Sequence, residues 1–286
     1  MKTVTIVPNT QKDPSLECTK KAIEVISHYA EKIIINADIP LNDVNHCVEK
    51  RESSRIFEGT DVVITVGGDG TILKLAPELS ILNIPILGIN LGRVGFMAEI
   101  EPEEMHLVEK LFSSEYIIDS RMMLDVEVFR NGVKLCSYSC LNDAVIMNGS
   151  VSKMIELELS CNHAYVTTYH ADGLILSTPT GSTAYSLSAG GAVIDPVLEC
   201  ILVTPVCAHS FHNARPMVFS SNAEFTVKDV AKRDDDIYLT LDGNFNVHVL
   251  KNDIIKIKKS QFTTDLIRIK SNRFYNTVYN KLSERR

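Results

Sequence analysis

This sequence of 286 residues lacks the positive charge that is typical of nucleic-acid-binding proteins and the long apolar runs that are typical of membrane proteins. It has no excess of positive charge, because 29 Lys and Arg residues stand against 36 Asp and Glu residues, a formal net charge of −7. A general nucleic-acid binder needs a basic face that neutralises phosphates, so we expect no nucleic-acid partner. No apolar run approaches the roughly 20 residues that a membrane span requires, so we expect no membrane partner.

The sequence also contains no C-x-x-C motif, and we expect no secretory signal peptide. The first residues read as a strand, without the apolar segment and cleavage site of a secretory signal. None of the seven cysteines forms a C-x-x-C pair, which favours a reducing compartment and predicts a cytoplasmic protein. Cys136 and Cys140 would lie on one face of a strand, roughly 13 Å from each other, and are expected to be small buried apolar residues. The cysteines are Cys18, Cys47, Cys136, Cys140, Cys161, Cys200 and Cys207.

The N-terminal part of the chain alternates between strand and helix patterns. One apolar run, residues 62–66, is continuous rather than alternating, which is typical of a parallel strand covered on both faces. The alternation predicts an α/β domain with an open, mostly parallel sheet. Strands are expected at 3–7, 33–35, 62–66 and 85–90. Helices are expected at 15–31, 41–57, 71–82 and 102–113, with Pro77 kinking or splitting the third.

After Tyr116 the pattern changes to short runs with alternating polarity. Arg130-Asn131-Gly132 separates the first two runs and predicts a hairpin turn. Short strands with frequent turns predict an all-β domain, a sandwich or a partly closed barrel. The tail, residues 272–282, is helical again and is expected to return to the first domain. We therefore expect an α/β domain at 1–118 with the tail at 265–286, and a β-rich domain at 119–264.

A glycine-rich turn, Gly67-Gly68-Asp69-Gly70-Thr71, stands between a predicted strand and a predicted helix. Amides at a helix N-terminus favour phosphate, and glycines let a ligand contact bare backbone. The Walker template fails because no lysine follows, and the dinucleotide fingerprint fails because Leu73 occupies its third glycine position. A carboxylate among such amides repels phosphate unless it binds Mg²⁺ or removes a proton. Asp69 is interpreted as a base or metal-site partner in phosphoryl transfer, with helix capping as the alternative.

Three further segments are candidates for ligand binding. Residues 90–96 (N-L-G-R-V-G-F) follow the next buried strand, so this loop and the first could face one crevice, although a plain turn is the alternative. Asn142-Asp143 places two polar residues between apolar strand positions, where a β-bulge is the alternative. Residues 172–191 combine seven Ser or Thr hydroxyls with glycines, Pro179 and Tyr185, which suits a flat polar ligand.

Protein metal sites and hydrolase triads are not predicted. His209-x-x-His212 has a spacing that a metal could use, but no third ligand follows at helix or strand spacing. No Ser-His-Asp or Cys-His arrangement can be assigned from spacing.

Taken in order, these segments resemble the NAD kinases, which phosphorylate NAD to NADP. The resemblance covers nearly the whole chain and rests on Gly67–Thr71, on Asn90–Gly92 with Gly95-Phe96, on Asn142-Asp143 and on residues 172–191. The first motif is shared with diacylglycerol kinases, sphingosine kinases and phosphofructokinases, whereas T-P-T-G-S-T-A-Y is specific to NAD kinases. The resemblance implies an α/β N-terminal domain, a β-rich C-terminal domain and a tail that packs back on the first.

The resemblance also implies roles for individual residues. Asp69 is similar to the catalytic aspartate that activates the 2′-hydroxyl of the adenosine ribose of NAD. Asn142 and Asp143 are similar to the pair that holds NAD ribose hydroxyls, where the family often has Glu at the second position. The other implied nucleotide-binding positions are Gly68, Gly70, Thr71, Phe96, Asp172, Thr180, Thr183, Ala184, Tyr185, Ser188, Cys207, His209 and Asp242.

Reactants and assembly follow from the same resemblance. ATP, or alternatively inorganic polyphosphate, is the expected donor and NAD the acceptor, with Mg²⁺ or another divalent cation bound mainly through donor phosphates. A homodimer or homotetramer is expected. The alternatives are a lipid kinase that shares the G-G-D-G motif and a non-catalytic NAD(P)-binding sensor. No basic amphipathic helix supports the first, and the second would tolerate loss of Asp69, which is present.

Overall fold

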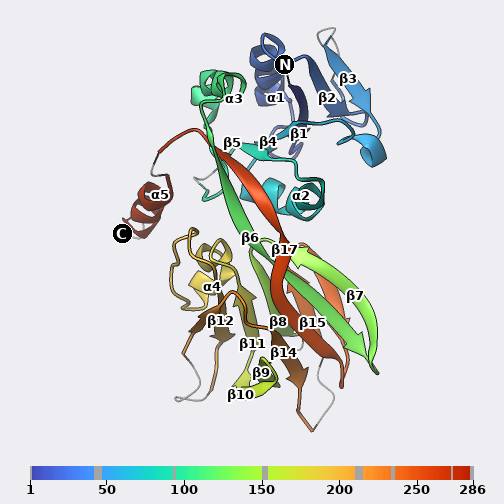
Figure 1. Cartoon of the computed structure of the whole chain (residues 1–286), viewed down its shortest axis with the longest axis vertical. Coiled ribbons are helices and arrows are strands. Elements are labelled where there is room, and N and C mark those ends of the chain that lie inside the picture. The colour runs from blue at the N-terminus through green and yellow to red at the C-terminus, as the bar shows by residue number, and fades with distance from the viewer. Residues whose placement is uncertain are drawn as a thin grey trace. The chain divides into compact units, whose positions relative to one another are not determined.

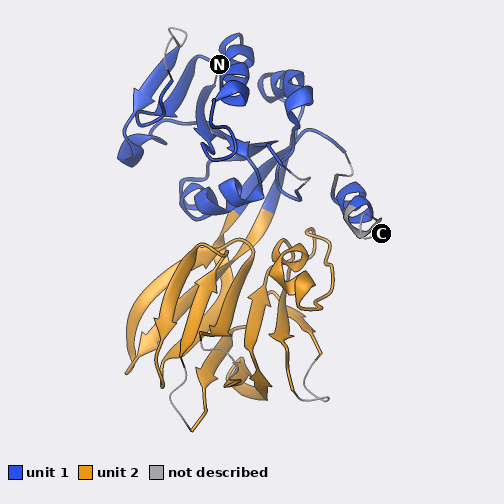
Figure 2. Cartoon of the chain, turned by 180° about the vertical axis from the view of Figure 1, so that it is seen from behind, with its two compact units in different colours: residues 1–120, 264–286 blue, residues 121–263 orange. Residues whose placement is uncertain are grey.

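The computed structural model describes residues 2–41, 47–92, 95–149, 154–209, 215–232, 236–271 and 273–283. The chain forms two compact units, residues 1–120 with 264–286 and residues 121–263 (Figures 1 and 2). Two long strands, β6 (Ile117–Arg130) and β17 (Ile254–Arg268), run from one unit into the other. The sequence places the corresponding boundaries at 118/119 and 264/265. None of the helices among the described residues is long and apolar enough to cross a membrane.

Unit 1 is an α/β domain built on a parallel sheet. Its elements are β1 (Thr3–Pro8), α1 (Glu17–Ser27), β2 (Lys32–Asn36), β3 (Val48–Arg51), η1 (Ser53–Arg55), β4 (Val62–Gly67), α2 (Asp69–Leu82), β5 (Ile86–Asn90), η2 (Pro102–Glu109), α3 (Lys110–Ser113) and α5 (Arg273–Ser283). The strand order is β3-β2-β1-β4-β5, and every adjacent pair is parallel. Strands β4 and β5 are buried along their whole length, which confirms the predicted α/β class.

One expected helix of this unit is wrong. The sequence predicts a helix over 41–57, but residues 48–51 form the edge strand β3 and 53–55 a single 3₁₀ turn; residues 42–46 lie outside the described part. Strand β3 pairs in parallel with β2, from Ile33↔Val48 to Asn36↔Arg51. This ladder satisfies backbone groups of both strands, and such tertiary pairing overrides a weak local helix preference.

A split of this helix at Pro77, one of the two expected outcomes, is absent as well. Helix α2 continues from Asp69 to Leu82 with Pro77 inside it. Proline removes one backbone hydrogen bond and costs about 3 kcal/mol in a helix interior. The helix buries Ile72, Ala76 and Leu79 almost completely, and burial of apolar side chains on this scale offsets the loss.

Unit 2 consists of two antiparallel sheets. Its further elements are β7 (Val133–Cys140), β8 (Asp143–Asn148), β9 (Ile155–Cys161), β10 (Ala164–Ala171), β11 (Gly173–Ser177), η3 (Gly181–Thr183), α4 (Tyr185–Ser188), β12 (Cys200–Val206), β13 (Met217–Ser220), β14 (Phe225–Asp229), β15 (Ile237–Leu241) and β16 (Phe245–Val249). One sheet has the order β13-β12-β11-β8-β15-β16; the other contains β10-β9-β14-β17 with β6 and β7. The predicted β-rich domain is confirmed.

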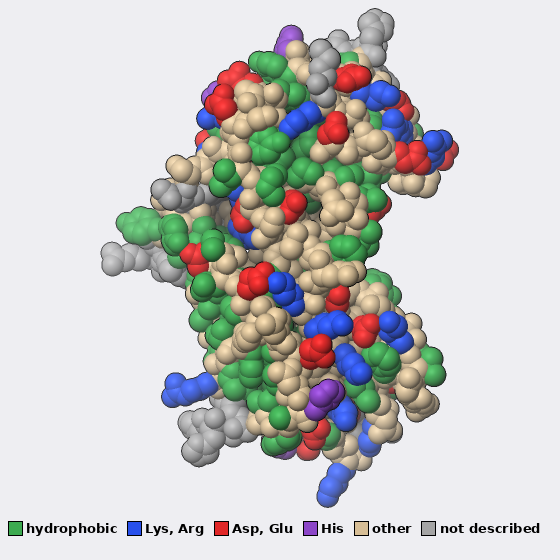
Figure 3. Space-filling model, in the orientation of Figure 1, with side chains coloured by type: hydrophobic (Ala, Val, Ile, Leu, Met, Phe, Trp, Pro, Cys, Tyr) green, Lys and Arg blue, Asp and Glu red, His purple; other side chains and the backbone are tan. Residues whose placement is uncertain are grey.

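An apolar core lies between these two sheets. Leu174 and Leu239 project into it from one sheet, and Val126 and Phe225 from the other. The turn at Asn131-Gly132 joins β6 and β7 with positive φ at both residues, 51° and 79°, as the hairpin prediction requires. On the face in Figure 3, Lys and Arg side chains are interspersed with Asp and Glu side chains.

Candidate active site

The glycine-rich turn lies at the carboxyl edge of the parallel sheet. Gly67 ends β4, Gly68 precedes helix α2, and Asp69 is the first helical residue. The neighbouring strands β1 and β5 run parallel to β4, so the loops that follow all three strands meet at this edge. Leu91 N–H donates to Gly67 O, which joins the second glycine-containing loop to the first. Ligands of open α/β sheets bind beyond such carboxyl ends.

The carboxylate of Asp69 is held by the second loop. Its Oδ2 accepts a hydrogen bond from Phe96 N–H at 2.8 Å. Its Oδ1 accepts bonds from Met97 N–H and Ala98 N–H at 3.1 and 3.0 Å. Gly95 packs so closely that a Cβ there would overlap the carboxylate. Because Gly68 is the cap and Asp69 bonds to another segment, the helix-capping alternative is wrong.

This arrangement leaves one acceptor position on Asp69. A carboxylate has about four lone-pair positions. Two bonds reach Oδ1 and one reaches Oδ2, so the unused position is on Oδ2. Asp69 is therefore fixed in orientation and can still accept one hydrogen bond or one proton.

Arg268 fixes the same loop from its other side. Its Nη1 donates to Met97 O at 2.8 Å and to Glu99 Oε2 at 3.2 Å, and its Nη2 donates to Phe96 O at 3.1 Å. Both charged side chains are buried, with Glu99 at 0% and Arg268 at 7% exposure. The peptide groups between Phe96 and Met97 and between Met97 and Ala98 thus join the carboxylate of Asp69 to a buried guanidinium. Arg268 could not be identified from the sequence, because an arginine near the end of a long strand forms part of no local motif.

In unit 2, a hollow of about 440 Å³ gathers five of the predicted nucleotide-binding residues. Val145, Met147 and Thr240 also line it, and none of the three was predicted from the sequence. Strands β8 and β15 pair Val145 with Thr240, so these side chains lie on one face of the sheet. Alternating strands do not reveal in the sequence which face carries a ligand. The five predicted residues in the lining are Asn142, Asp143, Ala184, Tyr185 and Asp242.

Asp242 organises one wall of this hollow. It sits in an Asp-Gly turn between β15 and β16, where Asp242 and Gly243 have φ of 48° and 67°. Its Oδ2 accepts the Leu141 N–H at 2.8 Å. Its Oδ1 accepts the N–H groups of Asn142 and Asp143 at 2.7 and 3.2 Å. The acid therefore fixes the backbone of residues 141–143 at the edge of the hollow.

Asp143 and Asp242 form a buried acidic pair. Burial raises the pKa of Asp143 to about 7, and the neighbouring charge of Asp242 adds to this shift. Burial also raises the pKa of Asp242, against which its three backbone donors act. The side chain of Asp143 is 4% exposed, so its charged form gains strongly from any hydroxyl donor that enters the hollow.

Replacing Asp143 with Asn should remove a pH dependence of stability. Because the folded pKa of Asp143 lies above its ordinary value of 3.8, its contribution to stability is full below about pH 4 and is lost as pH rises through 7. The lost contribution is on the order of 4 kcal/mol. Urea unfolding at pH 5 and pH 8 measures it: Asp143→Asn should gain stability over the unchanged protein, and more at pH 8. Equal pH dependence in both proteins would contradict the assigned shift.

The Ser/Thr-rich loop folds against residues 141–142. Thr178 Oγ1 donates to Leu141 O at 2.6 Å, and Thr178 N–H donates to Asn142 O at 2.9 Å. Gly181 lies against the backbone of Asn142, where a Cβ would overlap it. Only glycine fits this close approach, and it brings the segment with Ala184 and Tyr185 to the hollow.

The other predicted residues lie outside the lining of the hollow. Burial raises the pKa of Tyr185, with smaller contributions from Cys207, Asp143 and Asp172, so these groups lie near its phenol. His209 N–H donates to His170 O at 2.9 Å, and His212 is outside the described residues. In unit 1, Gly68, Gly70, Thr71 and Phe96 surround Asp69. The predicted residues of unit 2 outside the lining are Asp172, Thr180, Thr183, Ser188, Cys207 and His209.

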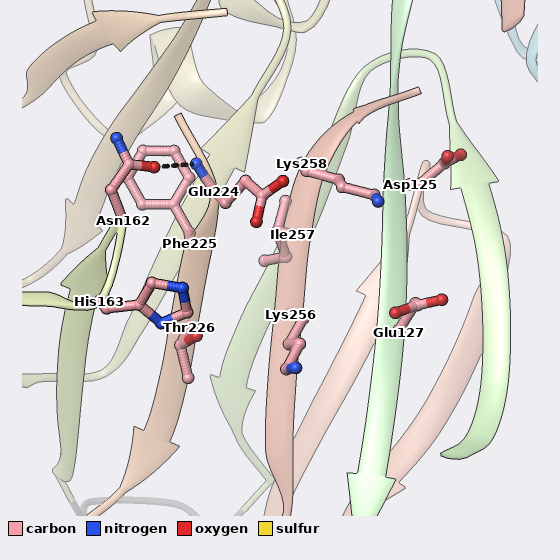
Figure 4. Close-up of a pocket in the computed structure, with 10 residues that line it drawn as sticks. All are labelled: Asp125, Glu127, Asn162, His163, Glu224, Phe225, Thr226, Lys256, Ile257 and Lys258. Atoms are coloured by element: carbon pink, nitrogen blue, oxygen red, sulfur yellow. Dashed lines mark hydrogen bonds between the residues drawn. The ribbon is translucent and has the colours of Figure 1, made fainter. Parts of the chain in front are cut away.

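No cluster of three or more His, Cys, Asp or Glu side chains that could hold a metal ion is found in the described ranges. Another hollow of unit 2, of about 160 Å³, lies on the other sheet (Figure 4). Its polar lining includes the carboxylates of Asp125 and Glu127 and the ammonium groups of Lys256 and Lys258. None of the predicted site residues lines it, so it is not part of the candidate site.

Comparison with known proteins gives matches over both units. The sequence matches the family models of the ATP-NAD kinase N-terminal domain over residues 4–116 and the ATP-NAD kinase C-terminal domain over residues 141–269. An NAD kinase from Caldanaerobacter subterraneus subsp. tengcongensis is 37% identical over 286 residues, which cover 100% of both chains.

Two crystal structures are similar to this chain. Yeast NADH kinase complexed with NADH has a TM-score of 0.85 and 26% identity, over 99% of this chain and 88% of that one. An NAD kinase from Archaeoglobus fulgidus in complex with ATP has a TM-score of 0.72 and 26% identity, over 98% of each chain.

Proposed function

This chain belongs to the NAD kinase family, and on that premise we propose that it transfers the terminal phosphoryl group of ATP to the 2′-hydroxyl of the adenosine ribose of NAD. The resemblance inferred from the sequence is thereby confirmed. The observation that carries the reaction is the carboxylate of Asp69, fixed by three backbone N–H groups with one acceptor position left. A positioned base beside a phosphate-favouring helix N-terminus is what phosphoryl transfer requires.

We propose that the hollow of unit 2 binds NAD. The buried carboxyl of Asp143 accepts hydrogen bonds from ribose hydroxyls, and Tyr185, 40% exposed, offers a ring face to the nucleotide. Asp242 acts through the backbone of residues 141–143, which it holds in place. The support for this assignment is that five residues implied by the family resemblance line one hollow.

Mg²⁺, or another divalent cation, accompanies the donor in this proposal. Mg²⁺ keeps several of its waters and binds through substrate phosphates together with at most one or two carboxylates. The described residues suit this mode, since they offer no three-member ligand cluster and Asp69 already accepts three backbone bonds. When bound, the ion supplies positive charge that offsets the charge developing on the phosphoryl group.

Donor range, assembly and location belong to the same proposal. ATP is the donor, with inorganic polyphosphate as a second candidate, and the protein acts as a homodimer or homotetramer in the cytoplasm. All seven cysteines are free thiols, which supports a reducing compartment. The family match does not support the lipid kinase or the non-catalytic sensor.

Formation of NADP tests the proposed function directly. Purified protein is incubated with NAD, Mg²⁺ and ATP, and NADP is measured with an NADP-specific dehydrogenase. We expect one NADP for each ADP released. NAD binding without turnover would indicate a sensor, and phosphorylation of diacylglycerol instead of NAD a lipid kinase. The same assay with polyphosphate or NADH defines the donor and acceptor range.

A further inference from the structure

The turn that follows strand β1 is fastened to the glycine-rich turn. Asn9 N–H donates to Val66 O at 2.8 Å, and Asn9 Nδ2 donates to Thr71 Oγ1 at 3.3 Å. Within the turn, Asn9 O accepts the N–H groups of Lys12 and Asp13 at 3.0 and 2.9 Å. The backbone of Lys12 is therefore held at a fixed place beside the first turn of α2.

The ammonium group of Lys12 lies over two glycines from different loops. A Cβ built on Gly68 would be 2.7 Å from Lys12 Nζ, and one built on Gly92 would be 3.2 Å from it. Gly68 belongs to the loop after β4, and Gly92 to the loop after β5. Any larger residue at Gly68 would displace the ammonium, so bare backbone at this point makes room for the lysine.

This ammonium group has no carboxylate partner among the described residues. The adjacent carboxylate of Asp13 bonds to Thr19, whose N–H and Oγ1 donate at 2.9 and 2.6 Å. The carboxylate of Asp69 is directed to the loop at 96–98. Within the described ranges, Lys12 takes part in no ion pair. A positive charge is thus held without a counterion over the phosphate-favouring turn.

We propose that Lys12 binds a phosphate of the donor, an assignment that rests on the proposed function. The Walker template places its phosphate-binding lysine directly after the glycine loop. Here the loop carries no such lysine, and the ammonium comes from the turn after the neighbouring strand β1. A donor phosphate lies between this ammonium and the N–H groups of Asp69 and Gly70 at the start of α2, which helix geometry leaves without an intrahelical acceptor. Nothing lies within 4 Å of a Cβ built at Gly70, so a ligand can approach there.

Lys12→Met tests the assignment, because it keeps an unbranched stem and removes the charge. We expect kcat/KM for ATP to fall about 10- to 100-fold, as for loss of one charge-assisted hydrogen bond, and KM for NAD to change less than about twofold. Lys12→Arg should recover most of the loss. The matched control is Lys20→Met, since Lys20 is an exposed lysine on α1 whose Nζ donates to Ser15 O at 3.4 Å. This control should behave as the unchanged protein.

ATP binding in the absence of NAD, measured by titration calorimetry, separates this proposal from the proposed function. If the unchanged protein forms NADP and Lys12→Met keeps both its kcat/KM and its ATP affinity, the Lys12 assignment is overturned and the function stands. If the unchanged protein forms no NADP, the proposed function is overturned. The ATP affinities of the unchanged protein and of Lys12→Met then decide whether Lys12 binds a donor phosphate. An affinity at least about tenfold weaker in Lys12→Met supports the assignment. Equal affinities, or no ATP binding by the unchanged protein, overturn it. An unchanged melting temperature confirms that the variant is folded.

Discussion

Asp69→Asn is expected to lower kcat about 10²- to 10⁴-fold while NAD binding persists. The substitution removes the carboxylate that is fixed beside the start of α2 and has one acceptor position left on Oδ2. Because that position is the one proposed to take the proton of the 2′-hydroxyl, an amide there cannot act as a base. The measurement is NADP formation at saturating NAD and ATP, with the NAD affinity determined separately by calorimetry. Turnover near that of the unchanged protein would sink the base assignment.

Asp69→Asn is also expected to lower the stability of the fold, and this effect must be measured separately from the loss of rate. The amide oxygen of Asn can accept the bonds from Met97 and Ala98, but the amide nitrogen then faces the Phe96 N–H. The partly buried Phe96 N–H then loses its acceptor, which costs about 1–3 kcal/mol. A lower melting temperature is therefore expected along with the loss of rate. Asp61→Asn is the matched control, since this exposed carboxylate also accepts a backbone bond, from Thr3 N–H at 2.8 Å, but precedes the opposite end of β4 from the turn. It should leave kcat unchanged.

The α/β class could be predicted because its signal is local. The continuous apolar run at 62–66 becomes the buried strand β4, and the Asn131-Gly132 turn adopts the two positive φ angles of a hairpin. The prediction of a helix over 41–57 was wrong because residues 48–51 form strand β3, which depends on its ladder with β2. The sequence around residues 41–57 contains no sign of that pairing. Patterns within one segment are readable in the sequence, whereas pairing between segments overrides them.

The residues of the candidate site differ in the same respect, namely whether a local motif in the sequence reveals them. Asp69 could be identified because glycines and a carboxylate stand together in five residues of sequence. Lys12 and Arg268 could not, since each reaches its loops from a distant part of the chain. Lys12 lies over Gly68 and Gly92, and Arg268 donates to the carbonyl groups of Phe96 and Met97. Both are ordinary basic residues in their own segments, and only the tertiary structure shows what their charges contact.

Arg268→Met is expected to destabilise the protein by about 3–5 kcal/mol and to lower kcat in what remains folded. The variant leaves the fully buried carboxylate of Glu99 without its guanidinium partner. It also removes the Arg268 hydrogen bonds to the carbonyl groups of Phe96 and Met97. The N–H groups of these two residues orient Asp69. Urea unfolding measures the stability, and NADP formation at a temperature where the variant is folded measures kcat.

Arg55→Met is the matched control for the loss of an Arg-Glu pair. Arg55 Nη2 lies 2.9 Å from Glu58 Oε2, but both side chains are exposed, at 69% and 56%. Solvent screens such a pair, so this control should match the unchanged protein in stability and in rate. Equal effects of the two arginine variants would contradict the role given to burial.

A double-mutant cycle distinguishes positioning of Asp69 from general support of the fold. If Arg268 acts on the reaction through the loop that holds Asp69, its removal can lower kcat only while the carboxylate is present. Arg268→Met should then cost little further rate in the Asp69→Asn background, although the loss of stability remains. Independent sites instead give effects that add. Additive losses of rate would show that Arg268 supports unit 1 without orienting the catalytic carboxylate, whereas a strongly reduced second loss assigns it as a positioning residue.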